Sequence, residues 1–159
     1  MQMINLDPPG LAPGKIPVFV IRSESLRQTL HELPRALDPL DLEHVFVVAP
    51  TPVPRGPGWS SKLRFQQVAT DEILKQQGCL CCDLRSELAL FLGQLFMSLL
   101  ARRQPRVKAI LVLTQAQEAT ALRDALEHSS FLAQRYVLAG VLHNSAGAFD
   151  RVVTVDASR

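Results

Sequence analysis

Residues 16–34 read IPVFVIRSESLRQTLHELP, and they decide the fold because an apolar strand runs directly into an amphipathic helix. The first six residues form a continuous apolar run rich in β-branched side chains, which is typical of a strand buried on both faces. Ser25 followed by Gln28 has the spacing of a capping box and predicts the start of a helix. We expect this helix to run to about Leu33, where Pro34 ends it.

The same alternation of strand and helix continues along the chain. Apolar runs predict further strands at 44–49, 63–68, 107–113, 136–142 and 152–155. Helices are predicted at 84–103 and 116–128, and the longer one carries an apolar stripe at helical spacing, from Leu84 through Leu88, Phe91, Leu92, Leu95, Phe96 and Leu99 to Leu100. Because each strand is apolar along its length, we predict a three-layer α/β fold. Its mostly parallel central sheet has helices on both faces. The prolines that precede residues 63–68 place that strand at a sheet edge.

Length and composition indicate one folded domain. The chain has 159 residues, of which 47% are hydrophobic and 20% charged, values typical of a globular protein. Residues 1–15 hold three prolines and two glycines. We therefore interpret them as a flexible leader, followed by a single α/β domain over residues 16–159.

Charge and hydropathy exclude several classes of protein. A net charge of +2 from scattered basic residues gives no nucleic-acid-binding surface. The longest uncharged stretch, residues 88–101, is 14 residues long, shorter than the roughly 20 that a membrane-spanning helix needs. Residues 1–15 lack the basic start and apolar run of a signal peptide. Three cysteines crowded into four positions make a poor disulfide framework. We therefore expect a cytoplasmic protein with reduced thiols.

The most distinctive chemistry lies in Cys79, Cys81 and Cys82, just before the long predicted helix. Thiolates bind soft or borderline cations such as zinc, and a helix N-terminus lowers thiol pKa values. Three thiolates leave a tetrahedral ion one ligand short. Asp83, His143, His44, water or a partner protein are the candidates for the fourth ligand. Such an incomplete site suits metal transfer.

Two other interpretations of the cysteines remain open. Free cysteine is often buried, so the three residues are also compatible with simple core packing. Cys79 and Cys82 form a C-x-x-C pair, which is typical of thiol oxidoreductases and redox sensors.

The cysteine segment also has a family resemblance. Residues 78–88, GCLCCDLRSEL, resemble the GCxCC-x-x-R-x-[DE]-L signature of the CobW-type metallochaperone GTPases. Residues 16–18, 71–73 and 131–142 are similar to other segments of that family, so the resemblance covers most of residues 16–155. It implies a Ras-like P-loop fold, GTP-dependent metal delivery, and zinc or cobalt bound at the cysteines.

The nucleotide-binding motifs of that family have no counterpart here. Residues 22–29, RSESLRQT, stand where the P-loop should follow the first strand, and they contain neither glycine nor lysine. Residues 10–15, GLAPGK, mimic a P-loop but precede the strand. TQAQ at 114–117 replaces the acidic E-x-x-G that follows the strand at 107–113. We therefore expect GTP and Mg²⁺ not to bind and GTP hydrolysis to be lost.

The combined prediction is a pseudo-GTPase with a degenerate P-loop-NTPase-like fold that binds or relays zinc through Cys79, Cys81 and Cys82. Its expected partners are the metal ion and either an intact CobW-type GTPase or a client metalloprotein, with no nucleic acid and no membrane. The alternatives are a thiol redox protein and an interaction module that pairs with an intact GTPase.

Overall fold

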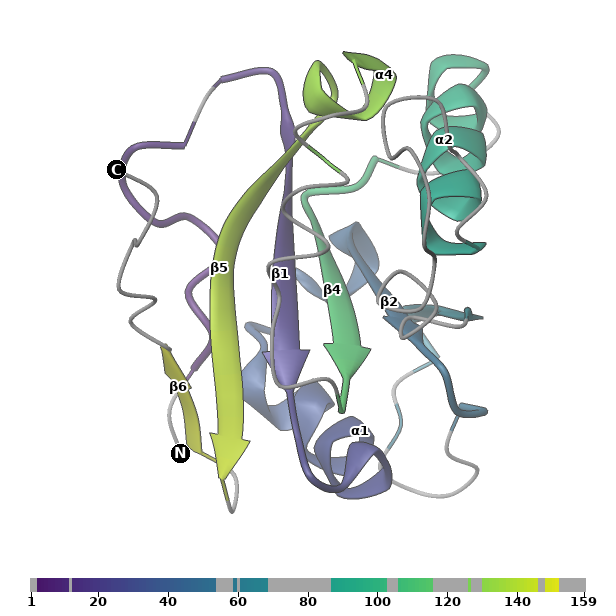
Figure 1. The fold of residues 1–159 in the computed structure, drawn as a ribbon. Coiled ribbons are helices and arrows are strands. Elements are labelled where there is room, and N and C mark those ends of the chain that lie inside the picture. Colours follow the sequence, from purple (N-terminus) through teal and green to yellow (C-terminus); the bar gives the residue numbers. More distant parts are fainter. Residues whose placement is uncertain are drawn as a thin grey trace.

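A computed structural model describes residues 3–11, 13–53, 59, 61–68, 87–102, 106–115, 126, 130–145 and 148–151. These residues form one sheet with helices packed against it (Figure 1). The predicted helix at 116–128, apart from Leu126, and the predicted strand at 152–155 lie outside the described residues.

The sheet has six strands in the order β3-β2-β4-β1-β5-β6. The strands are β1 (Ile16–Arg22), β2 (Val45–Ala49), β3 (Arg64–Gln67), β4 (Ala109–Thr114), β5 (Tyr136–Ser145) and β6 (Ala148–Arg151). All neighbours pair in parallel except β5 and β6, which pair antiparallel. The prediction of a mostly parallel sheet is therefore confirmed, as is the edge position of β3. The hairpin strand β6 was not predicted.

Alternate side chains of the strands enter two separate cores. Phe19 and Ile21 of β1 pack with α1 (Leu26–Ala36) on one face, which we call the α1 face. Val18 and Val20 pack with α2 (Glu87–Leu100) and α4 (Ser130–Ala133) on the other, which we call the α2 face. Because successive residues of a strand point to opposite faces, the apolar β1 run supplies both cores. The molecule is thus an α/β structure with helices on both faces of the sheet.

Helix α1 begins where the sequence predicts and ends later. The Ser25 hydroxyl accepts a hydrogen bond from the Gln28 amide at 3.3 Å and so caps the helix. The predicted end at Pro34 is wrong, because the helix continues through Pro34 to Ala36. The proline removes one helical hydrogen bond to the preceding turn, but the full burial of Leu33 and Ala36 offsets this cost.

Helix α2 is apolar on nearly all sides. Leu88, Leu92 and Leu95 are buried against the sheet, in agreement with the predicted stripe. Leu100, the last member of that stripe, is 63% exposed, so this part of the prediction is wrong. In the described part of the chain, no helix has both the length and the apolar character needed to cross a membrane.

The leader packs onto the domain. Ile4 and Leu6 are buried in the core of the α1 face, and the Ile4 amide donates a 2.7 Å hydrogen bond to the carbonyl of Ala36. This placement differs from the flexible leader that the prolines and glycines suggested. The physical reason is that two apolar side chains, spaced by two, cover the end of α1.

Candidate functional site

The carboxyl ends of β1 and β4 are where a doubly wound sheet is expected to bind ligands. The chain leaves β1 into α1, on the α1 face. After β4 it reaches Leu126, whose side chain is buried on the α2 face. Two neighbouring strands whose connections leave toward opposite faces define a switch point, and crevices form there in such sheets.

The turn between β1 and α1 is short and internally hydrogen-bonded. Only Ser23, Glu24 and Ser25 separate the two elements. The Ser23 amide donates to the Thr114 carbonyl at 3.1 Å, and the Ser25 amide donates to the Ser23 hydroxyl at 3.1 Å. Gln115, just after β4, also contacts this turn, because its side-chain Nε2 donates to the Glu24 carbonyl at 3.1 Å.

This hydrogen bonding has a chemical consequence. A phosphate-binding loop works by presenting several unpaired backbone N–H groups to the anion. Here the amides of Ser23, Ser25 and Gln28 already donate to protein oxygens. The amides of these three residues are therefore not available to bind a phosphate, and the turn serves to connect β1 to α1.

A buried polar network joins this turn to β5. Asn144 donates to the Thr29 hydroxyl at 2.7 Å and to the Glu32 carboxylate at 3.1 Å. The Thr29 hydroxyl in turn donates to the Ser23 hydroxyl at 2.5 Å. Thr29 is fully buried and Asn144 is 8% exposed, so each of these polar groups needs its partner. The sequence analysis missed this network because its members are far apart in the chain.

A second set of polar residues lies in a row on the α2 face at the same edge. Thr114 of β4 is in register with Arg22 of β1, Arg22 with His143 of β5, and His143 with Asp150 of β6. Val112, Val20 and Val141 stand two positions before Thr114, Arg22 and His143 in the same strands, and all three valines are buried in the core of the α2 face. By strand alternation the four polar residues share that face. They form what we call the polar row.

Two of the predicted site residues, His143 and His44, lie among the residues that the structure describes. The sequence suggested a loop after the strand, but His143 lies within β5, so that expectation is wrong. Its Nδ1 atom is buried and has no hydrogen-bond partner in the described residues. A buried, unpaired ring nitrogen is uncommon and calls for an explanation such as an ion. A neutral imidazole nitrogen is also a common zinc ligand, so this atom fits the chemistry of a metal site.

His44 is not brought near His143. It ends the short 3-10 helix Leu42–His44 before β2, at the amino edge of the sheet, and its Nδ1 lies 3.4 Å from the Arg106 carbonyl. Because the strands are parallel, a residue before β2 and a residue near the end of β5 lie at opposite edges. The structure therefore separates the two histidine candidates for the fourth ligand.

The other predicted ligands, Cys79, Cys81, Cys82 and Asp83, lie outside the described residues. Within the residues that are described, no group of three or more His, Cys, Asp or Glu side chains could hold a metal ion. The chain enters the cysteine segment after Val68, whose amide bonds to the Ala49 carbonyl at the carboxyl ends of β2 and β3. It leaves that segment into α2, on the face that carries His143.

In comparisons with known proteins, no family model, curated protein or solved structure matches this chain.

Proposed function

We propose that this protein is a CobW-like metal-binding protein that holds or relays zinc through Cys79, Cys81 and Cys82, with His143 as the fourth ligand. The observation that carries the proposal is the buried Nδ1 of His143, which has no hydrogen-bond partner in the part of the chain that the structure describes. It stands on the face of the sheet to which the cysteine segment leads, through α2. His143 is therefore favoured over Asp83 and His44.

The donor set suits zinc. Three thiolates and one imidazole make a tetrahedral Cys₃His set, which zinc accepts readily. Asp150 stands opposite His143 in the β5–β6 pair. Carboxylates beside ligating histidines commonly fix the orientation of the ring, and Asp150 has the register position for that role.

We further propose that the fold is a degenerate version of the P-loop architecture, without GTP or Mg²⁺. The hydrogen-bonded turn of Ser23, Glu24 and Ser25 supports this, because its amides are already paired. A protein that holds a metal without a GTP switch would exchange it with a client metalloprotein or an intact GTPase of the CobW type. We place it in the cytoplasm, where thiols stay reduced.

The test is a titration of reduced full-length protein with zinc against a competing chelator, repeated with Co²⁺, whose absorption reports thiolate ligands. We expect one metal per chain, with Cys81→Ser abolishing the thiolate signal. His143→Ala should weaken zinc binding by about tenfold or more. The exposed His31 of α1 gives the matched control, and His31→Ala should leave the affinity unchanged. Absence of thiolate-dependent binding at micromolar zinc, or full binding by Cys81→Ser, would refute the metal site.

The zinc titration also separates the metal site from a redox function. A thiol redox protein would form a reversible Cys79–Cys82 disulfide under mild oxidant, and zinc would not protect the thiols. In the zinc-binding protein we expect bound zinc to slow thiol oxidation markedly, because the thiolates are ligands. Mass spectrometry of alkylated protein distinguishes the two outcomes.

An interaction module is the second candidate function, and one feature of α2 favours it. Leu90, Met97 and Leu100 are 48%, 56% and 63% exposed, and α2 carries no charged residue after Glu87. A protein surface of this kind favours an apolar partner. The partner under this alternative is an intact CobW-type GTPase, and binding should be lost in Leu90→Ser/Leu100→Ser while zinc affinity is retained.

A further inference from the structure

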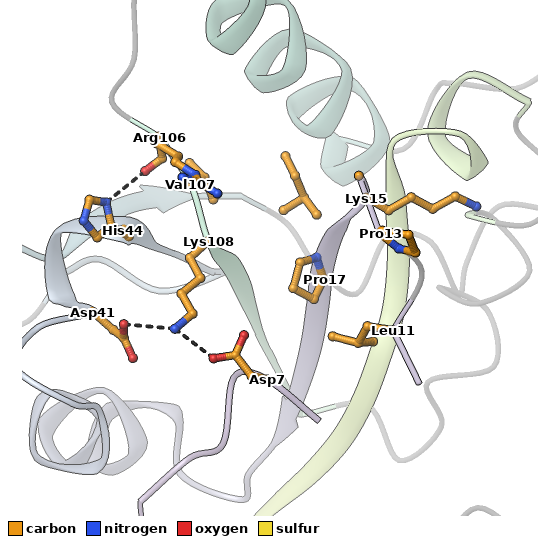
Figure 2. Close-up of a pocket in the computed structure, with 12 residues that line it drawn as sticks. Asp7, Leu11, Pro13, Lys15, Pro17, Asp41, His44, Arg106, Val107 and Lys108 are labelled. Carbon is orange, nitrogen blue, oxygen red and sulfur yellow. Dashed lines mark hydrogen bonds and ion pairs between the residues drawn. The ribbon is translucent and has the colours of Figure 1, made fainter. Parts of the chain in front are cut away.

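A pocket of about 720 Å³ lies at the amino edge of the sheet, opposite the polar row. One wall comes from the end of the leader, including Leu11 and Gly14, and another from the residues before and at the start of β1, Lys15 to Pro17. The approach to β4, Arg106 to Lys108, forms the remaining side (Figure 2). Its volume is in the range of sites that take small organic molecules.

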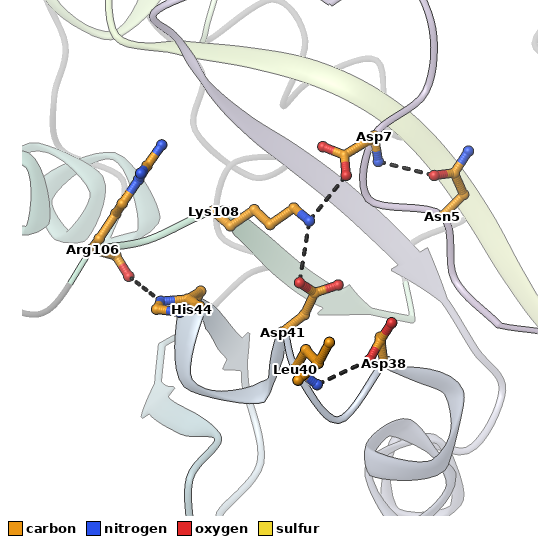
Figure 3. Close-up of polar contacts among 8 residues, drawn as sticks. All are labelled: Asn5, Asp7, Asp38, Leu40, Asp41, His44, Arg106 and Lys108. Carbon is orange, nitrogen blue, oxygen red and sulfur yellow. Dashed lines mark hydrogen bonds and ion pairs between the residues drawn. The ribbon is translucent and has the colours of Figure 1, made fainter.

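One cation that lines the pocket, Lys108, is paired with both lining carboxylates. The Lys108 ammonium lies 3.0 Å from the Asp7 carboxylate and 3.2 Å from that of Asp41 (Figure 3). The hydrogen bond to Asp7, the hydrogen bond to Asp41 and the charge of both carboxylates raise the pKa of Lys108, and partial burial opposes this shift. Both lining carboxylates are therefore already engaged with one cation. The Asp7 contact also links the leader to Lys108, the residue before β4.

The rim of the pocket carries two further cations, Lys15 and Arg106. Neither Lys15 nor the guanidinium of Arg106 has an ion-pair partner among the residues that the structure describes. In Figure 2 Arg106 and Lys15 lie on opposite sides of Pro17, and the Lys15 side chain extends away from it. With Lys108 they outnumber the lining carboxylates by one, so the pocket has an excess positive charge.

The surface between these cations is apolar. Pro17 and Val107 are buried, and Leu11 and Ile16 are half-buried. Gly14 adopts a φ of +82° with nothing within 4 Å of where a Cβ would lie, so the backbone leaves space on this side. An apolar floor flanked by cations matches a ligand with an apolar body and an anionic group.

We infer that this pocket binds a small organic anion, whose apolar body lies on Leu11, Ile16, Pro17 and Val107 and whose charge is attracted by the excess positive charge that Arg106 and Lys15 give the rim. The site is separate from the cysteines and from His143, and its occupancy does not depend on metal.

The test uses isotope-labelled full-length protein and amide chemical shifts in solution. Benzoate is the probe, benzyl alcohol supplies the same ring without charge, and inorganic phosphate supplies charge without the ring. We expect benzoate to cause saturable shifts centred on Gly14, Lys15, Val107 and Lys108, with both other probes several-fold weaker. Added salt should weaken benzoate binding, since the rim charges are exposed.

The decisive variant is Lys15→Gln/Arg106→Gln, which should weaken benzoate binding by about fivefold. The matched control is Arg27→Gln/Arg35→Gln, which removes two exposed cations from α1 and should leave the affinity unchanged. Equal affinity for benzoate and benzyl alcohol, shifts scattered away from the pocket, or full binding by the Lys15/Arg106 variant would overturn the inference. Amide spectra of each variant report folding directly, and the salt dependence of the unsubstituted protein tests the charge requirement without any substitution.

Discussion

Asn144, near the end of β5, donates a 2.7 Å hydrogen bond to the hydroxyl of Thr29 in α1, 115 residues earlier in the chain. The same amide reaches the Glu32 carboxylate at 3.1 Å. One buried side chain thereby attaches helix α1 to β5, the strand that pairs with β1. This link holds the β1–α1 turn closed at the carboxyl edge.

Replacing Asn144 should therefore destabilise the protein. We expect Asn144→Ala to lower the free energy of unfolding by about 1–3 kcal/mol, because it leaves the buried Thr29 hydroxyl and the partly buried Glu32 carboxylate without this donor. Urea unfolding of the two proteins measures the difference. Gln94→Ala, at an exposed position of α2, is the control and should change stability by less than about 0.5 kcal/mol. A comparable loss in both variants would contradict the role of Asn144.

Tyr136 gives a second stability prediction. Its hydroxyl donates a 2.6 Å hydrogen bond to the Leu92 carbonyl, joining β5 to α2 in the buried core of the α2 face. Tyr136→Phe should cost about 1–2 kcal/mol, since the carbonyl would lose its partner. Thermal or urea unfolding checks this, and no measurable loss would show that water replaces the hydroxyl.

The pH dependence of stability follows from the same residue. Burial raises the pKa of Tyr136 well above its usual value, and the positive charge of Arg135 opposes this only in part. The unfolded chain ionises first, so the contribution of Tyr136 is complete below about pH 10 and is lost as the pH rises toward the folded-state pKa. Its slope is at most about 1.4 kcal/mol per pH unit.

The chain has one tyrosine, so tyrosinate absorbance reports Tyr136 alone. We expect ionisation in the folded protein only above pH 10 and a shallower loss of stability for Tyr136→Phe over the same range. Tyrosinate formation near pH 10 while the protein stays folded would contradict the burial of the hydroxyl.

The ion pairs at the amino edge should contribute little and depend on salt. Lys108 contacts Asp41 at 3.2 Å with the lysine side chain one-third exposed. We expect Asp41→Asn to cost at most about 1 kcal/mol at low salt and less at high salt, because solvent screens the pair. Glu43→Gln is the neighbouring exposed control. A salt-independent loss in Asp41→Asn alone would instead indicate a packing defect.

Nucleotide binding can be tested directly. A calorimetric titration of the full chain with GTP and Mg²⁺ should give no saturable heat, because the amides of Ser23 and Ser25 already have acceptors. Ser23→Gly/Ser25→Gly, which removes both hydroxyl acceptors, should not restore binding, since the lysine of a P-loop is still missing. Stoichiometric binding by the unsubstituted protein would contradict the proposed loss.

Much of the fold could be predicted from local patterns. The apolar runs of β1, β2, β4 and β5 are long, continuous and β-branched, and a strand buried on both faces needs no more than that signal. The cap at Ser25 is equally local, since its hydroxyl bonds an amide three residues away. The helix end at Ala36, after Pro34, was missed because tertiary burial of the last turn outweighs the local cost of proline.

The candidate site could be predicted only in part. The sequence indicated His143 as a candidate ligand because histidine binds metals and this one follows a predicted strand. It did not indicate which residues of the neighbouring strands lie beside His143. Arg22 and Asp150 become its neighbours only through the register of β1, β5 and β6. Strand order depends on which crossovers bury the most apolar surface, and this is a property of the whole sheet.

The sequence by itself therefore determined the succession of elements from β1 to β5 that the structure describes, except for the 3-10 helix Leu42–His44 and the short helix α4, and the parallel character of their sheet, because each depends on neighbouring residues. Tertiary structure alone decided that Asn144 meets Thr29, that His143 lies between Arg22 and Asp150, and that the leader closes a pocket around Lys108. These contacts join segments far apart in the chain. They form only when the hydrophobic burial of both faces brings the strands into one register.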